Sequence, residues 1–151
     1  MKGVVGFLFF LLFLAGFFLV FLQGKQLANQ NLSAGGAKLT GVRWRPIYIG
    51  AEAIPQEAGL YVQFEHDGSI NGHGGCNAFF GSLEETESGV TVGPLGSTRK
   101  ACAEAVMRRE DAFLESLQET TGVELAGNRL TCLNADRKLL VELVADVTKT
   151  E

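Results

Sequence analysis

The chain has 151 residues, of which 46% are hydrophobic and 20% charged, and its formal net charge is −4. This length suffices for one hydrophobic core and is crowded for two domains, and the composition excludes a disordered chain, collagen, a coiled coil and a multi-pass membrane protein. The hydrophobic residues are unevenly spread, because 7 of the 11 phenylalanines lie in the first 24 residues.

An apolar segment occupies residues 4–22, VVGFLFFLLFLAGFFLVFL, without a charge or a strongly polar group. As a helix it is roughly 28 Å long, close to the hydrocarbon thickness of a bilayer. The core of a signal peptide is shorter, and a small-x-small cleavage site soon follows it, whereas Gln23, Gly24 and Lys25 follow here. We therefore expect residues 1–24 to be an N-terminal transmembrane helix that acts as a membrane anchor, with a cleaved signal peptide as the alternative.

The next segment, residues 25–38, is polar and has no apolar period, which predicts a tether between the membrane and a domain. Lys2 precedes the span, and Lys25 and Lys38 follow it, so the positive-charge bias is weak. The three residues ahead of the span favour the N-in, C-out arrangement of a signal anchor.

The domain is expected at residues 39–147, where 9 basic residues stand against 16 acidic ones, a formal charge of −7. An acidic surface repels nucleic-acid phosphates and anionic lipid head groups. We therefore expect no nucleic-acid partner.

Alternation of apolar and polar residues dominates this domain and predicts short antiparallel strands. An opening strand carries Trp44, Ile47 and Ile49 and is kinked by Pro46. Further strands are expected at Leu60–Phe64, from Ile70, at Asn77–Leu83, Val90–Val92, Val123–Leu125, Leu130–Cys132 and Leu139–Val144, with turns at Asp67-Gly68, Gly127-Asn128 and Asn134–Asp136.

One segment, Ala103–Gln118, has its apolar residues at helical spacings instead. Gly122 is expected to mark the stop of this helix. The predicted fold class is α+β and β-dominated: an antiparallel curved sheet or partial barrel with one amphipathic helix covering an opening.

The densest cluster of reactive residue types is His73–Gly81, HGGCNAFFG. His73 and Cys76 could supply two zinc ligands, but no second close pair completes a site. A thiol nucleophile at Cys76 is disfavoured because nothing marks a low-pKa thiolate, and paired glycines more often serve a tight backbone passage. We therefore expect no catalytic residue, no metal, no cofactor and no enzyme activity.

A second polar run, Ser97–Lys100, precedes the helix. It could cradle a phosphate, but the sequence has no glycine-rich loop with the spacing of a P-loop here. We expect a Ser/Thr turn and helix cap with solvated cations.

The three cysteines, Cys76, Cys102 and Cys132, allow one disulfide and one leftover thiol in an oxidising compartment. Three pairings are open. Because Cys132 is in phase with Leu130 on a strand, it is expected to be a buried core residue, and Cys76–Cys102 is the preferred bridge.

Five features occur together in this order: Trp44, the hairpin FEHDGSING at 64–72, the run GCNAFFG with Gly75, Asn77, Phe79 and Gly81, the run STRKAC with Thr98 and Arg99, and the helix pattern Met107-x-x-Glu110-x-x-Phe113-Leu114-x-x-Leu117. With these features, roughly residues 39–144 resemble the META domain, or heat-shock HslJ, family of bacterial envelope proteins.

The resemblance implies a small barrel-like antiparallel sheet with a helix, exported proteins linked to stress responses, and some members similar to pilotins. It carries over no catalytic residue, and the motif residues are expected to be structural. We expect a non-enzymatic domain tethered to the inner membrane of the bacterial cell envelope, which faces the periplasm or cell exterior and binds an unknown envelope protein in stress response or envelope maintenance. The alternative is a pilotin-like carrier of a lipid or small hydrophobic ligand in a cavity lined by Leu60, Val62, Phe64 or Phe113; a cleaved segment would instead give a secreted protein.

Overall fold

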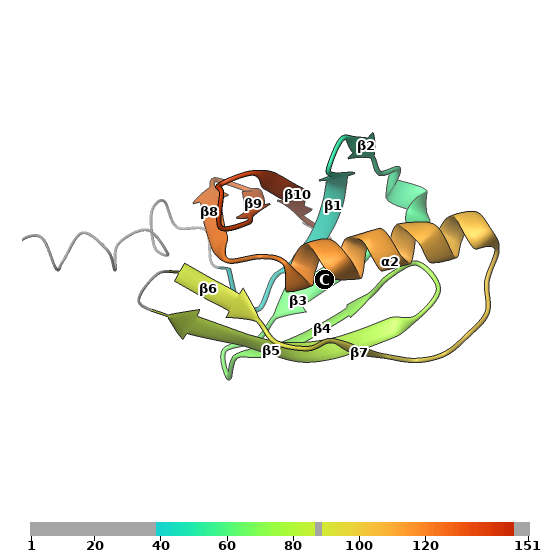
Figure 1. Ribbon diagram of the computed structural model, residues 1–151, viewed down its shortest axis with the longest axis horizontal. Helices are drawn as coiled ribbons and strands as arrows, with labels where there is room; N and C mark the ends of the chain where they lie inside the picture. Colours follow the sequence, from blue (N-terminus) through green and yellow to red (C-terminus); the bar gives the residue numbers. More distant parts are fainter. Residues whose placement is uncertain (1–38, 87–88, 147–151) are drawn as a thin grey trace, which may run out of the picture. The chain divides into compact units, whose positions relative to one another are not determined.

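The structure, a computed structural model, describes residues 39–86 and 89–146 (Figure 1). Its strands are β1 Arg43–Ile49, β2 Glu52–Ala53, β3 Tyr61–Phe64, β4 Ser69–His73, β5 Ala78–Thr86, β6 Gly89–Val92, β7 Gly96–Ser97, β8 Gly122–Ala126, β9 Arg129–Leu133 and β10 Leu139–Ala145. The helices are the 3-10 turn η1 Gln56–Ala58 and the α-helix α2 Glu104–Gln118.

The strands form one antiparallel sheet in the order β6-β5-β4-β3-β1-β10-β9-β8, with β2 added beside β1 and β7 beside β5. The sheet curves until its two end strands, β6 and β8, lie close to each other. A Cβ atom at Gly89 on β6 would lie only 2.5 Å from the carbonyl oxygen of Thr121, just before β8. The predicted curved sheet is thus a nearly closed barrel.

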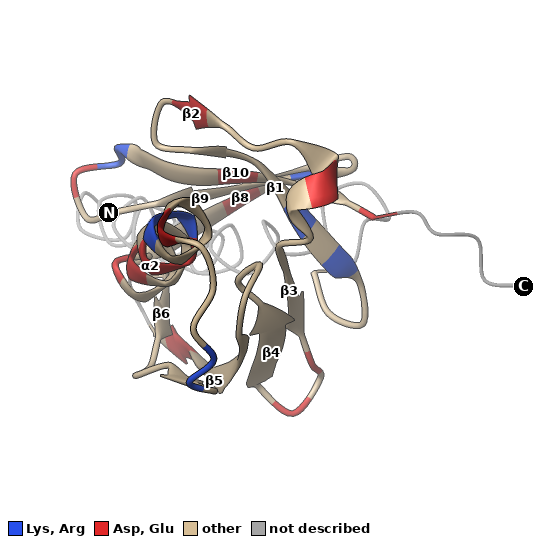
Figure 2. Cartoon of the chain, turned by 90° about the vertical axis from the view of Figure 1, so that its right-hand side faces the viewer, with Lys and Arg blue, Asp and Glu red and all other residues tan. Residues whose placement is uncertain are grey.

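Helix α2 covers the remaining opening. Viewed nearly along its axis, it lies between the β8–β9–β10 side and the β4–β5–β6 side of the sheet (Figure 2), and it contacts β1, β6 and β10. Phe113 and Leu117 point inward and are 0% and 1% exposed. The apolar face of the helix therefore completes the core, as its helical spacing predicts.

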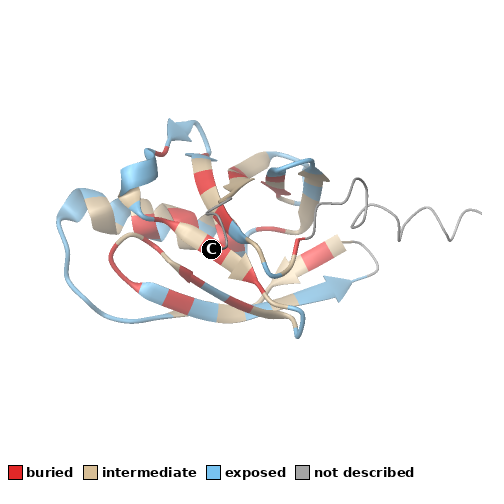
Figure 3. Ribbon diagram, turned by 180° about the vertical axis from the view of Figure 1, so that it is seen from behind, coloured by how far each residue is buried: buried red, intermediate tan, exposed pale blue. Residues whose placement is uncertain are grey.

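The core is built from inward-facing residues of successive strands, which alternate with half-buried or exposed ones along strands such as β1, β3 and β4 (Figure 3). Trp44 on β1 is buried, and its indole N–H donates to the carbonyl oxygen of Leu39 at 2.8 Å, so no donor is left unpaired. The register of β1 against β10 shifts between Pro46 and Tyr48, because proline cannot donate to the ladder. The predicted kink is confirmed as this irregularity.

The end of the helix differs from the sequence-based expectation. Helix α2 ends at Gln118, and Gly122 is the first residue of β8, so the predicted glycine stop is wrong. Glu119 closes the helix in right-handed conformation, its N–H donating to the carbonyl of Glu115, and the Thr120 hydroxyl donates to the carbonyl of Ser116 at 2.9 Å. These bonds satisfy terminal carbonyls without a left-handed residue.

The expected transmembrane segment and tether, residues 1–38, lie outside the described residues. Within residues 39–86 and 89–146, no helix combines the length and apolar character needed to span a bilayer.

Candidate functional site

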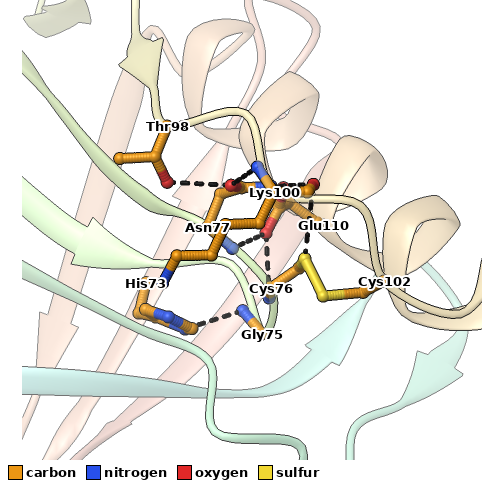
Figure 4. Close-up of a disulfide and its surroundings, with 8 residues drawn as sticks. All are labelled: His73, Gly75, Cys76, Asn77, Thr98, Lys100, Cys102 and Glu110. Carbon is orange, nitrogen blue, oxygen red and sulfur yellow. Dashed lines mark hydrogen bonds between the residues drawn. A yellow bond between two sulfur atoms is a disulfide. The ribbon is translucent and has the colours of Figure 1, made fainter.

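The loop between β4 and β5 is covalently joined to the segment that precedes α2. Cys76 and Cys102 form a disulfide with an S–S distance of 1.99 Å and a Cα–Cα distance of 6.0 Å, across 26 positions of sequence (Figure 4). The preferred pairing is confirmed. Cys132 is the remaining thiol, and it is buried as predicted.

A buried carboxylate lies beside this disulfide. Glu110 on α2 is 3% exposed, and its Oε2 accepts hydrogen bonds from the backbone N–H groups of Cys76 at 3.0 Å and Asn77 at 2.6 Å. Its Oε1 accepts from the Asn77 side-chain amide at 2.7 Å. Three donors from one loop thus compensate the burial of a charge-bearing side chain.

Asn77 connects that carboxylate to the run before the helix. Its Oδ1 accepts from the Thr98 hydroxyl at 2.8 Å and the Lys100 backbone N–H at 2.7 Å, and its Nδ2 also lies 3.3 Å from the Lys100 carbonyl (Figure 4). The predicted cap at Ser97–Lys100 is therefore wrong. Helix α2 begins after Ala103 without a side-chain cap, and the Thr98 hydroxyl is used by Asn77 instead.

The two glycines before Cys76 allow the loop to approach the helix. A Cβ atom at Gly74 would lie 2.5 Å from Glu110 Cγ, so only glycine fits there. Gly75 has φ +104°, a conformation that side chains disfavour, and its N–H donates to His73 Nδ1 at 3.1 Å. We call Gly74, Cys76, Asn77, Thr98, Lys100 and Glu110 the Asn77–Glu110 cluster.

The other motif residues lie around this cluster without joining it. Phe79 is in the core, where its ring meets Phe113 edge-on with centroids 5.9 Å apart. Gly81 allows Leu95 to pack on β5, since a Cβ atom there would lie 2.5 Å from Leu95 Cδ2. Arg99 is exposed, and within the part of the chain that the structure describes its side chain has no hydrogen bond or ion pair.

Two titratable groups have displaced pKa values, each for a local reason. Burial raises the pKa of the Cys132 thiol from 9.0 to about 12, so it is not a reactive thiolate near neutral pH. In the β3–β4 turn, hydrogen bonds from the hydroxyl and backbone N–H of Ser69 lower the pKa of Asp67. Among the described residues no group of three or more His, Cys, Asp or Glu side chains is placed to hold a metal ion.

The Asn77–Glu110 cluster therefore has a structural role. Its carboxylate, amide and hydroxyl are engaged with one another or with the backbone, and its cysteine is in a disulfide. It holds the β4–β5 loop, the segment before α2 and the helix in one arrangement.

An open surface pocket of about 330 Å³ lies elsewhere, at the start of β8 and the turn between β9 and β10. It is lined by Thr121, Gly122, Leu133, Asn134, Ala135 and Arg137. The four residues expected to line a carrier cavity, Leu60, Val62, Phe64 and Phe113, instead belong to the packed core cluster.

Sequence reasoning named Glu110 in the helix pattern and gave the paired glycines a tight backbone passage, but it did not predict that Glu110 and Gly74 meet. A usable signal for Glu110 was its place three residues before Phe113 and three after Met107, on the helix face that turns inward. The close approach at Gly74 left no local signal, because it involves a residue 36 positions away.

Comparison with protein-family models finds one that describes the META domain, matched by residues 37–146. The chain belongs to the META domain family. In this META domain, the cluster joins Cys76 and Asn77 of the GCN motif to Thr98 and Lys100 of the STRKAC run and to Glu110 of the helix pattern.

Solved structures show the same fold at low sequence identity. A protein from Burkholderia xenovorans, solved by NMR, is 19% identical, with a TM-score of 0.58 over 72% of this chain and 84% of that one. A second NMR structure is 24% identical, with a TM-score of 0.57 over 74% and 95%. A crystal structure of a DUF4847 family protein from Bacteroides vulgatus ATCC 8482 is 13% identical, with a TM-score of 0.52 over 70% and 93%. A search of curated proteins finds no match to this chain.

Proposed function

We propose that this META domain is a non-enzymatic binding module of the bacterial envelope, held at a membrane by residues 4–22. The observation that carries the proposal is that the carboxylate, amide and hydroxyl of the Asn77–Glu110 cluster are bonded to one another or to the backbone. The sequence places its densest set of reactive residue types there, and the fold uses them for hydrogen bonds and a disulfide.

The proposed location is supported by two features of different kinds. The apolar segment 4–22 has the length of a bilayer span. The Cys76–Cys102 disulfide is of a kind that persists in oxidising compartments such as the periplasm and is rare in the cytosol. An anchor that leaves the domain on the outer side of the inner membrane accounts for both.

The domain's role there, in this proposal, is to support stress tolerance or envelope maintenance by binding another envelope component. Family membership supports a shared architecture, while the acidic surface argues against nucleic acid as that component. The carrier alternative has less support, because the residues expected to surround a ligand are core residues that pack together.

The test is crosslinking of the full chain in intact bacterial cells, followed by identification of the captured molecules by mass. The proposal predicts a captured envelope component that is absent when residues 1–24 are deleted and the domain is left in the cytoplasm. Capture of cytoplasmic proteins alone by the full chain would contradict it.

A further inference from the structure

The convex side of the sheet, facing away from α2, carries an ordered row of polar and aromatic side chains. Arg43 on β1 is opposite Gln63 on β3, Gln63 is opposite Asn71 on β4, and Asn71 is opposite Phe80 on β5. At a strand spacing of about 4.8 Å, the row from Arg43 to Phe80 spans about 14 Å. With the adjacent Tyr61, Glu65 and His73, these residues are called the outer row.

Phe80 provides an aromatic surface that is open to solvent. Its side chain is 64% exposed, although a phenyl ring is normally buried. The ring lies over Gly96 on β7, where a Cβ atom would come within 2.7 Å of its Cζ. Glycine at that position thus lets the ring rest on the sheet with its other face uncovered.

The two amides of the outer row are held in place by one carboxylate. Glu65 Oε1 accepts from Gln63 Nε2 at 2.9 Å and from Asn71 Nδ2 at 3.0 Å. Within the described residues, the carbonyl oxygens of these amides accept no hydrogen bond from the protein. They are fixed acceptors that face solvent.

The far end of the row is also ordered. The Arg43 guanidinium lies 4.2 Å from the centroid of the Tyr61 ring, and the Tyr61 and His73 rings are stacked with centroids 6.4 Å apart. These contacts already restrict the side chains in the free protein, so binding a ligand costs less rotamer entropy.

This surface carries few charges, which suits an uncharged ligand. In Figure 2, β3 and β4 are almost free of charged residues apart from the hairpin that joins them. The outer row contains one cation, Arg43, and one carboxylate, Glu65, in a domain whose net charge of −7 disfavours an anionic polymer. An extended row on a convex face also suits a chain better than a compact small molecule, which prefers a concave site.

We propose that the outer row binds an uncharged polysaccharide strand. The apolar face of a sugar ring stacks on Phe80, and its hydroxyl groups donate to the Gln63 and Asn71 carbonyl oxygens. A protein partner is less suited, because interface hot spots are clusters of aromatic anchors that become fully desolvated, and the row offers one exposed phenyl ring. This inference rests on the proposed function, whose outward-facing domain lies beside cell-wall polymers, and it names the partner class.

The test is retention of the full chain, kept in a detergent without a sugar head group, on insoluble chitin and cellulose, with titration by N-acetylglucosamine and glucose hexamers. We expect retention on at least one of these polymers and weakening of about tenfold in Phe80→Ala. Tyr48→Ala is the matched control, because Tyr48 is also an exposed aromatic residue, 43% exposed, and lies outside the row. A cooperative thermal unfolding transition with a Tm close to that of the wild-type chain certifies that each variant is folded.

Failure of the folded wild-type chain to bind any of these glycans overturns the inference, as does equal binding by Phe80→Ala. Stronger retention on an anionic polymer such as alginate, or capture of a protein through Phe80, overturns it as well. Each of these results leaves the proposed function intact if in-cell crosslinking still captures an envelope component. Loss of that capture together with retained glycan binding would refute the proposed function and leave the glycan-binding inference standing.

Discussion

The carboxylate of Glu110 and the amide of Asn77 meet across 33 positions of sequence, at 2.7 Å from Oε1 to Nδ2. The backbone N–H of Asn77 donates to the other oxygen of the same carboxylate. One helix residue therefore fixes both the main chain and the side chain of the β4–β5 loop, beside the disulfide that joins the same loop to the start of the helix.

Glu110→Ala is expected to lower the free energy of unfolding by about 3 kcal/mol or more, because each donor left buried without a partner costs about 1–3 kcal/mol. Glu110→Gln should be less severe, since one oxygen remains for the two backbone N–H groups. Urea denaturation measures both variants. Asp111→Ala, an exposed carboxylate on the next position of the same helix, is the control and should change stability little. Equal effects of Glu110→Ala and Asp111→Ala would refute the structural role of Glu110.

Gly74→Ala is expected to destabilise the domain by about 1–3 kcal/mol, as overpacking does. The added Cβ atom would come within 2.8 Å of three Glu110 atoms, and Glu110 is held by three hydrogen bonds and cannot move aside freely. Gly122→Ala provides the control, because a Cβ atom there meets nothing within 4 Å. Thermal unfolding should give a lower Tm for Gly74→Ala alone, and the reverse order of the two variants would contradict the close approach.

Removal of the disulfide in Cys76→Ala/Cys102→Ala should lower the free energy of unfolding by roughly 3 kcal/mol, given a bridge across 26 positions. Chemical denaturation compares this variant with Cys132→Ala, which keeps the bridge. Under non-reducing conditions, intact mass should show two hydrogens lost and one thiol alkylated after unfolding. Three alkylated thiols in protein exported by cells would contradict the pairing.

Alkaline pH should weaken the fold through Cys132. Its pKa is 9.0 when unfolded and about 12 in the folded domain, so between these values the folded state keeps a proton that the unfolded state releases. This contribution is complete below pH 9 and is lost as the pH rises toward 12, at up to about 1.4 kcal/mol per pH unit. Cys132→Ala should flatten the decline of unfolding free energy over that range, and parallel curves for the two proteins would show that the thiol is not responsible.

Local patterns in the sequence predict the strands, the helix and the curved sheet, because alternation and helical spacing depend only on residues that are close in sequence. The strands β2 and β7 have two residues each and leave no such pattern, and they exist only because β1 and β5 lie beside them. Thr98 looks like a helix cap in sequence, yet its partner Asn77 lies 21 positions earlier. Glu110 and Gly74 are likewise defined by each other across the fold, which explains why the candidate site was less predictable than the sheet.

The central claim is that residues 4–22 hold an outward-facing domain at the membrane, and protease treatment of spheroplasts that carry the full chain tests it most directly. We predict a full-length chain that stays in the membrane pellet after carbonate washing and whose domain is digested by protease added outside. A full-length chain recovered in the soluble fraction, or a domain that the membrane protects from external protease, would contradict the claim.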